Sequence, residues 1–235
     1  MDVKKEKYKE VKLRGIRKTI AEHMVRSARE NAVIMESRTA DVTELIKLHE
    51  QKKKEKIAED ILIPSINDLV LKATALSLKE HPNLNATFEN EMIRIFEDIN
   101  INMAVALPNG LITPVIRNVD QLSIWDICKM TKEATEKVKT GMFDMDDITG
   151  GTFTVTNVGM LKIEVATAII NYPQVGILTI GTIVPRLERI NGDIADRLKI
   201  FLSITVDHRI IDGYPAAMFL NTICDILEKP ELLWE

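Results

Sequence analysis

Two strand-like runs near the C-terminal end of the 235-residue chain constrain its fold most. Residues 175–184 form a long apolar, β-branched run, which is typical of a buried strand, and residues 199–208 form a second one. Asn191-Gly192 lies between them and is a strong hairpin turn signal, because both residues tolerate positive φ angles. The chain is therefore expected to contain a β-sheet with an antiparallel pair near its C-terminal end.

Helical patterns precede and follow these strands. From Gly15, apolar residues recur once per turn, and Ser65 and Asp68 have the spacing of a capped helix start. Further helices are predicted over 41–56, 161–170 and from residues 123 and 215. Further strands are predicted over 101–107, 111–116 and 152–158, and a small hairpin over 88–96. Helices come mostly first and last, with strands and two hairpin turns between them. This order favours a mixed α+β sheet over a regular βαβ arrangement.

The composition is that of an ordinary globular protein. The formal net charge of −4 gives no reason to expect a nucleic-acid partner. No apolar run approaches the ~20 residues needed to span a bilayer, so no membrane partner is expected. The charged N-terminus does not resemble a signal peptide. Residues 1–12 are charged and poorly patterned, as in a linker or flexible tail.

The cysteines and histidines do not have the spacing of a metal site. Cys128 and Cys224 lie in helix-like segments without a CxxC partner, and the four histidines show no HxxxH or HExxH pattern. We therefore predict no metal site and two buried free thiols, which fit a cytoplasmic, reducing environment.

His208 ends the last strand-like run and is a candidate general base. Alternate residues from Ile200 to Val206 share one apolar face, and His208 falls on that face while Asp207 points the other way. An enclosed imidazole stays neutral because desolvation disfavours its charged form, so it can accept a proton at neutral pH. A core histidine bonded to a backbone carbonyl is the alternative interpretation of the same pattern.

Threonine hydroxyls form a second candidate constellation. Thr152, Thr154 and Thr156 alternate along one strand that ends at a glycine turn, where a hydroxyl could stabilise an oxyanion. Threonine chosen only for its strand propensity is the alternative. Asp212-Gly213, four residues after His208, is either an ordinary turn or the position of a carboxylate that pairs with a cation.

The stretch from Asp207 to Gly213 resembles the HxxxDG signature of the dihydrolipoamide acyltransferases, the E2 components of 2-oxo acid dehydrogenase complexes. Several other blocks resemble the same family in the same order. They are Arg17–Ala21, Ser65–Asp68, Asn109–Val115, Gly151–Met160 and Ala168–Gln174. One HxxxDG motif is a weak signal, but six ordered blocks are a strong one, and together they cover residues 13–235.

The resemblance implies acyl transfer between a dihydrolipoamide thioester and coenzyme A. His208 would deprotonate the coenzyme A thiol, and the Thr156 hydroxyl, where most members carry serine, would bind the oxyanion. Asp212 belongs to the same signature and would be structural, paired with Arg17. Residues of the substrate channel would be Asn109, Gly110, Leu111, Asn157 and Gly159.

The implied fold is that of chloramphenicol acetyltransferase, a mixed sheet with flanking helices that forms a trimer. His208 of one subunit would face Thr156 of the next, and trimers would assemble into a hollow core of the 24- or 60-chain type. The C-terminal Leu232, Leu233 and Trp234 would dock on a neighbouring trimer. Residues 1–12 would be a linker remnant. The lipoyl group and the contacts to the E1 and E3 components would belong to domains absent from this chain.

Two other functions fit the same fold. An O- or N-acetyltransferase would tend to carry a second histidine where Asp207 stands, and a non-catalytic assembly scaffold would not need His208 or Thr156. Gly181-Thr182-Ile183 occupies the place where succinyl-specific members usually carry a histidine-containing segment. That difference favours acetyl or branched-chain acyl groups.

Overall fold

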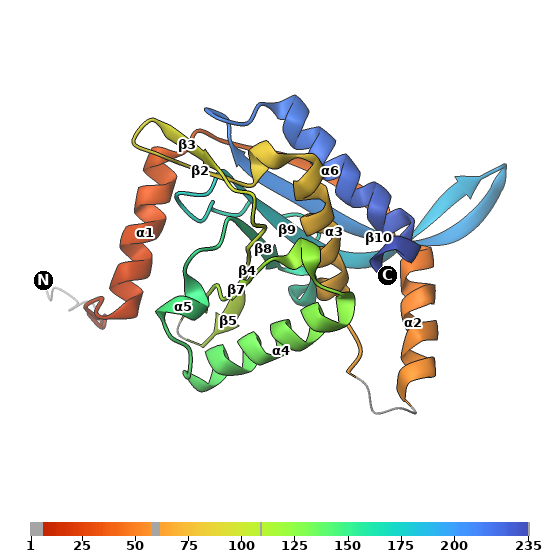
Figure 1. Cartoon of the computed structure of the whole chain (residues 1–235), viewed down its shortest axis with the longest axis horizontal. Coiled ribbons are helices and arrows are strands. Elements are labelled where there is room, and N and C mark those ends of the chain that lie inside the picture. The colour runs from red at the N-terminus through yellow and green to blue at the C-terminus, as the bar shows by residue number, and fades with distance from the viewer. Residues whose placement is uncertain (1–6, 58–61, 109, 235) are drawn as a thin grey trace, which may run out of the picture.

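The computed structural model describes residues 7–57, 62–108 and 110–234. A six-stranded mixed sheet lies at its centre, with the strand order β1-β10-β9-β8-β4-β7 (Figure 1). β8 runs parallel to both β9 and β4, and the remaining pairs are antiparallel. The strands are β1 Val33–Asp41, β4 Ile101–Met103, β7 Val115–Ile116, β8 Phe153–Asn157, β9 Gly176–Ile190 and β10 Asp193–Asp207. The predicted mixed α+β sheet with flanking helices is confirmed.

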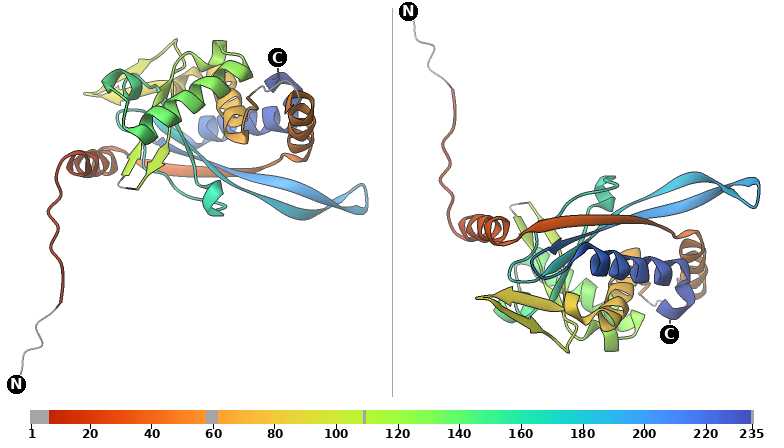
Figure 2. Two further views of the ribbon diagram at one scale, coloured as in Figure 1. Left: turned by 90° about the horizontal axis from the view of Figure 1, so that it is seen from below. Right: turned by 90° about the horizontal axis from the view of Figure 1, so that it is seen from above.

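Helices cover one face of this sheet. α3 (Ile66–Glu80), α4 (Ile124–Thr140) and α6 (Gly213–Glu228) lie together on that side (Figure 2). Phe153 of β8 and Phe219 of α6 meet edge to face, with ring centroids 5.6 Å apart, and both are buried. The predicted start of α3 is confirmed by a capping box, in which the backbone N–H of Ser65 donates to Asp68 over 2.7 Å.

The remaining elements lie around the sheet. They are the helices α1 Ile16–Glu30, α2 Thr43–Ile57 and α5 Met145–Ile148, the paired strands β2 Ala86–Glu89 with β3 Met92–Ile95, and β5 Val105–Leu107 with β6 Gly110–Ile112. Short 3₁₀ turns occur at Pro82–Leu84, Val119–Gln121, Gly159–Leu161 and Pro230–Leu233. Residues 7–14 are exposed and run away from the body (Figure 2).

Two segments that were predicted as single continuous strands are each divided into two strands. The expected strand 101–107 is divided at Ala104, because the N–H of Ala104 bonds to Val155 while the following residues leave the main sheet to form the β5–β6 hairpin. The expected strand 111–116 is likewise divided between β6 and β7. The division separates the hairpin from the central sheet, and this hairpin forms part of the cavity described below.

The helix predicted over 161–170 is also wrong. After the 3₁₀ turn at Gly159–Leu161, the chain continues to β9 without forming a helix. The N–H of Thr182 bonds to Ile163 over 2.8 Å, and a Cβ atom at Gly181 would overlap the carbonyl oxygen of Glu164. This close backbone approach to β9 leaves no space for the side chains of a helix.

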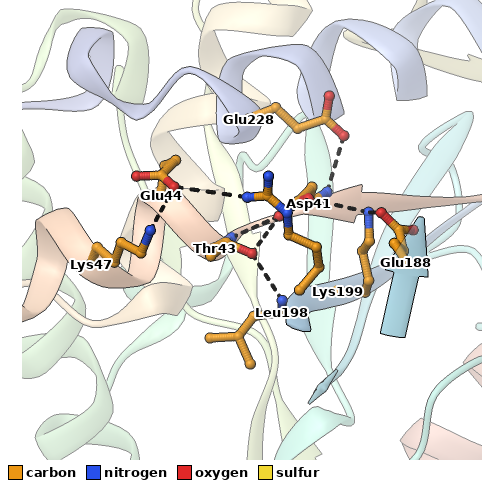
Figure 3. Close-up of polar contacts among 9 residues, drawn as sticks. Asp41, Thr43, Glu44, Lys47, Glu188, Leu198, Lys199 and Glu228 are labelled. Atoms are coloured by element: carbon orange, nitrogen blue, oxygen red, sulfur yellow. Dashed lines mark hydrogen bonds and ion pairs between the residues drawn. The ribbon is translucent and has the colours of Figure 1, made fainter. Parts of the chain in front are cut away.

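A charged cluster anchors the base of the long β9–β10 hairpin, whose end projects beyond the body of the protein (Figure 2). The ammonium of Lys199 lies 2.8 Å from Glu188 and 3.3 Å from Asp41, and its side chain is only 12% exposed. Asp41 also accepts hydrogen bonds from Thr43 at the start of α2 (Figure 3). The cluster therefore ties β1, α2 and the two hairpin strands together.

Leu232, Leu233 and Trp234 were all expected to be available for docking, but they differ in exposure. Leu233 is 1% exposed, and the Trp234 ring packs against Trp125 at a centroid distance of 5.8 Å. Only Leu232 remains exposed, because the 3₁₀ turn folds the other two residues onto the chain's own helices. Among the described residues, no helix has the length and apolar character required to cross a bilayer.

Candidate active site

His208 lies in the turn between β10 and α6. Its backbone N–H donates to the carbonyl of Ala32 over 2.7 Å, which fixes the turn to the chain segment before β1. Its side chain is 43% exposed, and Nδ1 lies 3.7 Å from Oδ1 of Asp212. The prediction of an enclosed His208 is therefore wrong for a single chain. β10 ends at Asp207, so the alternation that would have turned His208 inward stops one residue before it.

The residue before His208 is the buried one. The side chain of Asp207 is 1% exposed and accepts hydrogen bonds from the N–H of Ala32 and from the guanidinium of Arg209. This carboxylate raises the pKa of Arg209 above its ordinary value. The carbonyl of Asp207 also accepts from Ile210 and Ile211. Asp207 thus holds the turn that presents His208.

Thr156 lies at the end of a row of hydroxyl residues that crosses four strands. Thr156 pairs with Thr179, Thr179 with Ser203, and Ser203 with Ser37. Thr152 and Thr154 are committed to bonds with Asn100 and Gln174, whereas no hydrogen bond engages the Thr156 hydroxyl within the described chain. Of the three threonines expected to form a hydroxyl wall, Thr156 is the one with a hydroxyl available to a ligand.

A cavity of about 550 Å³ opens beside Thr156. Its walls come from α1, the β5–β6 hairpin, β8, β9 and the segment before β9, and they include Ile16, Ile20, Leu111, Ile112, Ile169 and Ile177. The polar residues of the lining are Thr19, His23, Thr113, Thr154, Thr156 and Asn171. The cavity is thus mostly apolar, with a few hydroxyl, amide and imidazole groups, as is usual for a small-molecule site.

Hydrogen bonds connect this cavity to the interior through residues that, apart from Thr154, had no role predicted from the sequence. His23 Nε2 lies 3.1 Å from Asn171 Oδ1, and Asn171 Nδ2 donates to the Thr154 hydroxyl over 3.4 Å. Thr154 in turn donates to Gln174, which donates to Asn102 over 2.7 Å. Asn171 and Gln174 belong to a block that resembles the family, and that block was the only sequence signal for them.

The other predicted site residues are distributed around the cavity. Leu111 lines it, and a Cβ atom at the adjacent Gly110 would lie 3.8 Å from the Arg17 guanidinium. Asn157 accepts from the N–H of Gly159 over 2.8 Å and so shapes the turn after β8. Asn109 lies outside the described residues.

The predicted pairing of Asp212 with Arg17 remains a prediction. Within the described part of one chain, Oδ1 of Asp212 lies 3.7 Å from Nδ1 of His208, and the Asp212 side chain is 82% exposed. Arg17 lies at the β5–β6 hairpin, beside Gly110. No group of three or more His, Cys, Asp or Glu residues in the described part of the chain has a geometry that would hold a metal ion.

Thr156 and His208 are separated within one chain. Thr156 lies in the same row as Ser203, and β10 continues from Ser203 to Asp207 before His208 follows. At ~3.3 Å per residue, His208 lies roughly 13 Å or more from Thr156 along the strand direction. The two strand spacings between β8 and β10 add roughly 10 Å across the sheet. Proton transfer requires hydrogen-bond contact at ~3 Å, so the two side chains do not meet in one copy.

Comparison with protein families places the chain near a group of acyltransferases. Residues 5–235 match the model of the 2-oxoacid dehydrogenases acyltransferase (catalytic domain). The chain is 38% identical to the dihydrolipoyllysine-residue acetyltransferase component of the Mycoplasma capricolum pyruvate dehydrogenase complex, over 96% of this chain and 52% of the relative. It is 34% identical to the yeast (Saccharomyces cerevisiae) succinyltransferase component of the mitochondrial 2-oxoglutarate dehydrogenase complex, over 95% of this chain and 49% of the relative. The chain thus spans about half the length of these curated relatives.

Solved structures agree with this grouping. A probable dihydrolipoamide acetyltransferase from Listeria monocytogenes superposes with a TM-score of 0.90 at 36% identity, covering 94% of this chain and 95% of that one. The cubic core of a pyruvate dehydrogenase multienzyme complex superposes with a TM-score of 0.91 at 29% identity, covering 98% of this chain and 95% of that one. Chloramphenicol acetyltransferase, at 15% identity and a TM-score of 0.56 over 88% of this chain and 94% of that one, shares the fold.

Proposed function

Because the chain belongs to the 2-oxoacid dehydrogenases acyltransferase (catalytic domain) family, we propose that it transfers an acyl group between a dihydrolipoamide thioester and coenzyme A. The observation that carries the proposal is the Thr156 hydroxyl, which has no hydrogen-bond partner in the described chain and lines a largely apolar cavity. A hydroxyl in this position can donate to an oxyanion that forms in front of it.

The reaction follows from the two candidate groups. His208 accepts the proton of the coenzyme A thiol, and the resulting thiolate attacks the thioester carbonyl. The carbonyl oxygen becomes an oxyanion and receives a hydrogen bond from Thr156. Collapse of this intermediate re-forms the carbonyl and breaks the bond to the dihydrolipoamide sulfur. That sulfur takes the proton from the His208 imidazolium, which restores the base.

Two copies of the chain are needed for this reaction. The separation of His208 and Thr156 along and across the sheet supports a site between subunits, with His208 from one copy and Thr156 from the next. The exposure of His208 in a single chain fits the same arrangement, because a neighbouring subunit would cover it. We therefore propose a trimer as the active unit and a larger hollow core built from trimers.

The remaining assignments extend this proposal. Asp212 and Arg17 would form a structural ion pair, and Asn109, Gly110, Leu111, Asn157 and Gly159 would border the substrate channel. Docking between trimers would use Leu232, the exposed apolar residue of the C-terminal turn. A lipoyl-bearing domain and the E1 and E3 components would be further partners. The two buried free cysteines support a reducing compartment such as the cytoplasm.

Acyl transfer from an acyl-coenzyme A to free dihydrolipoamide tests the proposal. We expect activity in the wild type and a loss of roughly 10²-fold or more in kcat for His208→Ala, which removes the base. His81→Ala is the matched control, because that histidine is bonded to Thr222 away from the cavity. Light scattering on each variant separates loss of chemistry from loss of assembly. Large particles without transfer, or unchanged transfer in His208→Ala, would reject the enzyme assignment.

A further inference from the structure

Positive charge is concentrated near the N-terminal end of the described chain. Residues 7–30 contain eight lysines and arginines and three glutamates, although the whole chain has a formal net charge of −4. They form the exposed segment 7–14, the turn at Gly15 and α1. A local excess of one sign of charge, on a protein whose net charge has the opposite sign, favours association with a partner of complementary charge.

A groove of about 620 Å³ lies between this segment and the outer face of α1. Its apolar lining includes Leu13 and Val25, which are 52% and 48% exposed, and its charged lining includes Lys12, Lys18 and Arg29. We call it the basic groove. A surface that combines exposed apolar residues with a charged rim is typical of a contact surface for another protein.

The charge of the basic groove is only partly neutralised within the chain. Its described lining holds four cations and two carboxylates, Glu22 and Glu30. Lys18 lies 3.6 Å from Glu22, in a pair whose side chains are 63% and 67% exposed, so water screens this contact strongly. Within residues 7–57, 62–108 and 110–234, no ion pair joins Lys12 or Arg29 to a carboxylate. These two cations are therefore available to the carboxylates of a partner.

The basic groove and the cavity beside Thr156 lie on two sides of the same helix. Ile20 and His23 of α1 line the cavity, whereas Lys18 and Val25 of α1 line the groove. An α-helix with its side chains is about 10–12 Å wide, so the two sites are separated by roughly that distance. A lysine side chain extended by a lipoyl chain is of comparable length. An acyl carrier held in the groove therefore has its acyl group within reach of the cavity.

The spacing of the cations suits a protein surface better than a phosphate group. Lys18 and Arg29 are eleven positions apart on α1, which corresponds to ~16 Å along the helix axis. A phosphate is bound by donors that converge on one point, such as an arginine fork or the N–H groups of one helix end. Cations distributed over three turns, with exposed apolar residues between them, match the extended contact of two proteins.

We propose that the basic groove is the docking surface for an acidic protein domain that carries a dihydrolipoyl-lysine. The proposal rests on the acyltransferase function above and adds where the acyl carrier binds. Apolar residues of the domain pack on Leu13 and Val25, and its carboxylates face Lys12 and Arg29. Docking raises the effective concentration of the lipoyl group beside the cavity, an advantage that free dihydrolipoamide does not have.

Acyl transfer from acetyl-coenzyme A to two acceptors provides the test. The assembled protein is assayed with free dihydrolipoamide and with a purified acidic domain that carries one dihydrolipoyl-lysine. The double substitution Lys12→Glu with Arg29→Glu reverses two charges of the groove. We expect it to lower kcat/KM for the domain by ~10-fold or more, and to leave kcat/KM for free dihydrolipoamide within ~2-fold of wild type. Added salt should lower the wild-type kcat/KM for the domain and not that for free dihydrolipoamide.

A second charge reversal of the same size is the matched control. Lys47→Glu with Lys53→Glu changes two lysines of α2, whose side chains are 66% and 47% exposed, and α2 lies far from α1 (Figure 1). We expect this variant to use both acceptors as the wild type does. Light scattering on both variants separates an effect on docking from an effect on assembly.

Four results would reject the docking surface. They are an unchanged kcat/KM for the domain in the groove variant, an equal loss with both acceptors, an equal loss in the α2 control, and wild-type transfer to dihydrolipoamide but not to the domain. A raised KM for coenzyme A in the groove variant would also reject it, because the groove would then bind the phosphates of coenzyme A. Wild-type transfer to neither acceptor is a distinct result, which would reject the acyltransferase function itself.

Discussion

Asp207 Oδ2 lies 2.6 Å from Nη2 of Arg209, and its Oδ1 lies 3.0 Å from Nε. These two residues flank His208 in the chain. The pair is bidentate, and the Arg209 guanidinium also stacks 4.8 Å from the centroid of the Phe88 ring. The main chain of His208 is therefore held from both sides while its imidazole remains accessible.

Asp207→Asn is expected to lower both stability and turnover. Arg209 would lose its ionic partner and keep only the weaker amide oxygen of a buried asparagine, at a cost of about 2–4 kcal/mol in the free energy of unfolding. A displaced His208 would lower kcat by ~10-fold or more with little change in the KM for coenzyme A. Urea denaturation and steady-state kinetics measure the two effects. The control Asp225→Asn removes an exposed ion pair with Arg38, and its free energy of unfolding is expected to change by less than about 1 kcal/mol. Unchanged kcat in Asp207→Asn would mean that the pair does not position His208.

Mixing two inactive variants tests whether the site lies between copies. His208→Ala and Thr156→Val each remove one half of the proposed site, and Thr156→Val keeps the shape of the side chain while deleting the hydroxyl. Random mixing during co-expression should restore activity at about a quarter of the sites, since each site needs an intact His208 from one copy and an intact Thr156 from another. If each variant alone assembles normally but the mixed trimers recover no activity, the proposed site between copies is wrong. His208 and Thr156 would then act in the same copy, or one of them would not belong to the site.

Some parts of this structure could be predicted because local sequence determines them. The start of α3 depends on Ser65 and Asp68, three residues apart, and the β9–β10 hairpin depends on adjacent turn residues, Asn191 and Gly192, both with positive φ. The helices α1 and α4 could be predicted for the same reason, because apolar residues that recur once per turn within a short segment indicate a helix. The order of predicted helices, strands and hairpin turns indicated a mixed sheet, and the six family blocks indicated the chloramphenicol acetyltransferase fold.

Other parts depended on contacts between distant segments. The burial of Asp207 rather than His208 depends on where β10 ends against Ala32, and no local pattern marks that point. The segment 161–170 is apolar enough for a helix, but the backbone of Gly181 approaches it too closely. The cavity lining and the network from His23 to Gln174 combine residues more than one hundred positions apart, so only the folded chain brings them together.

Both cysteines are expected to resist alkylation in the native protein. Burial raises the pKa of Cys128 to about 11 and that of Cys224 to about 12, and their exposed fractions are 4% and 0%. At about pH 8 the thiolate of Cys224 would then be on the order of one part in ten thousand, and the thiolate is the reactive form. Iodoacetamide labelling followed by mass spectrometry should find neither residue modified until denaturant is added. Rapid native labelling of Cys224 would show that α6 opens readily.

The cluster at the base of the β9–β10 hairpin is expected to make stability depend on pH in the acidic range. Burial alone would raise the pKa of Asp41, but hydrogen bonds from Thr43 and Lys199 outweigh it and hold the pKa below its ordinary value of 3.8. A carboxyl group whose pKa is lowered by folding stabilises the folded state above its unfolded pKa. This contribution is lost as the pH falls through the lower, folded-state value.

Asp41→Asn should therefore reduce stability at about pH 6, and the difference from wild type should shrink as the pH falls through 3.8 and below. Denaturant unfolding at several pH values measures this difference directly. Asp193→Asn is the matched control, because that aspartate is exposed at the far end of the same hairpin, beside the Asn191-Gly192 turn. Its stability should follow wild type at every pH. The two free energies of unfolding approach each other at low pH only if the Asp41 carboxylate of the wild type titrates. If their difference stays constant down to about pH 3, the substitution acts through altered packing and not through the charge of Asp41.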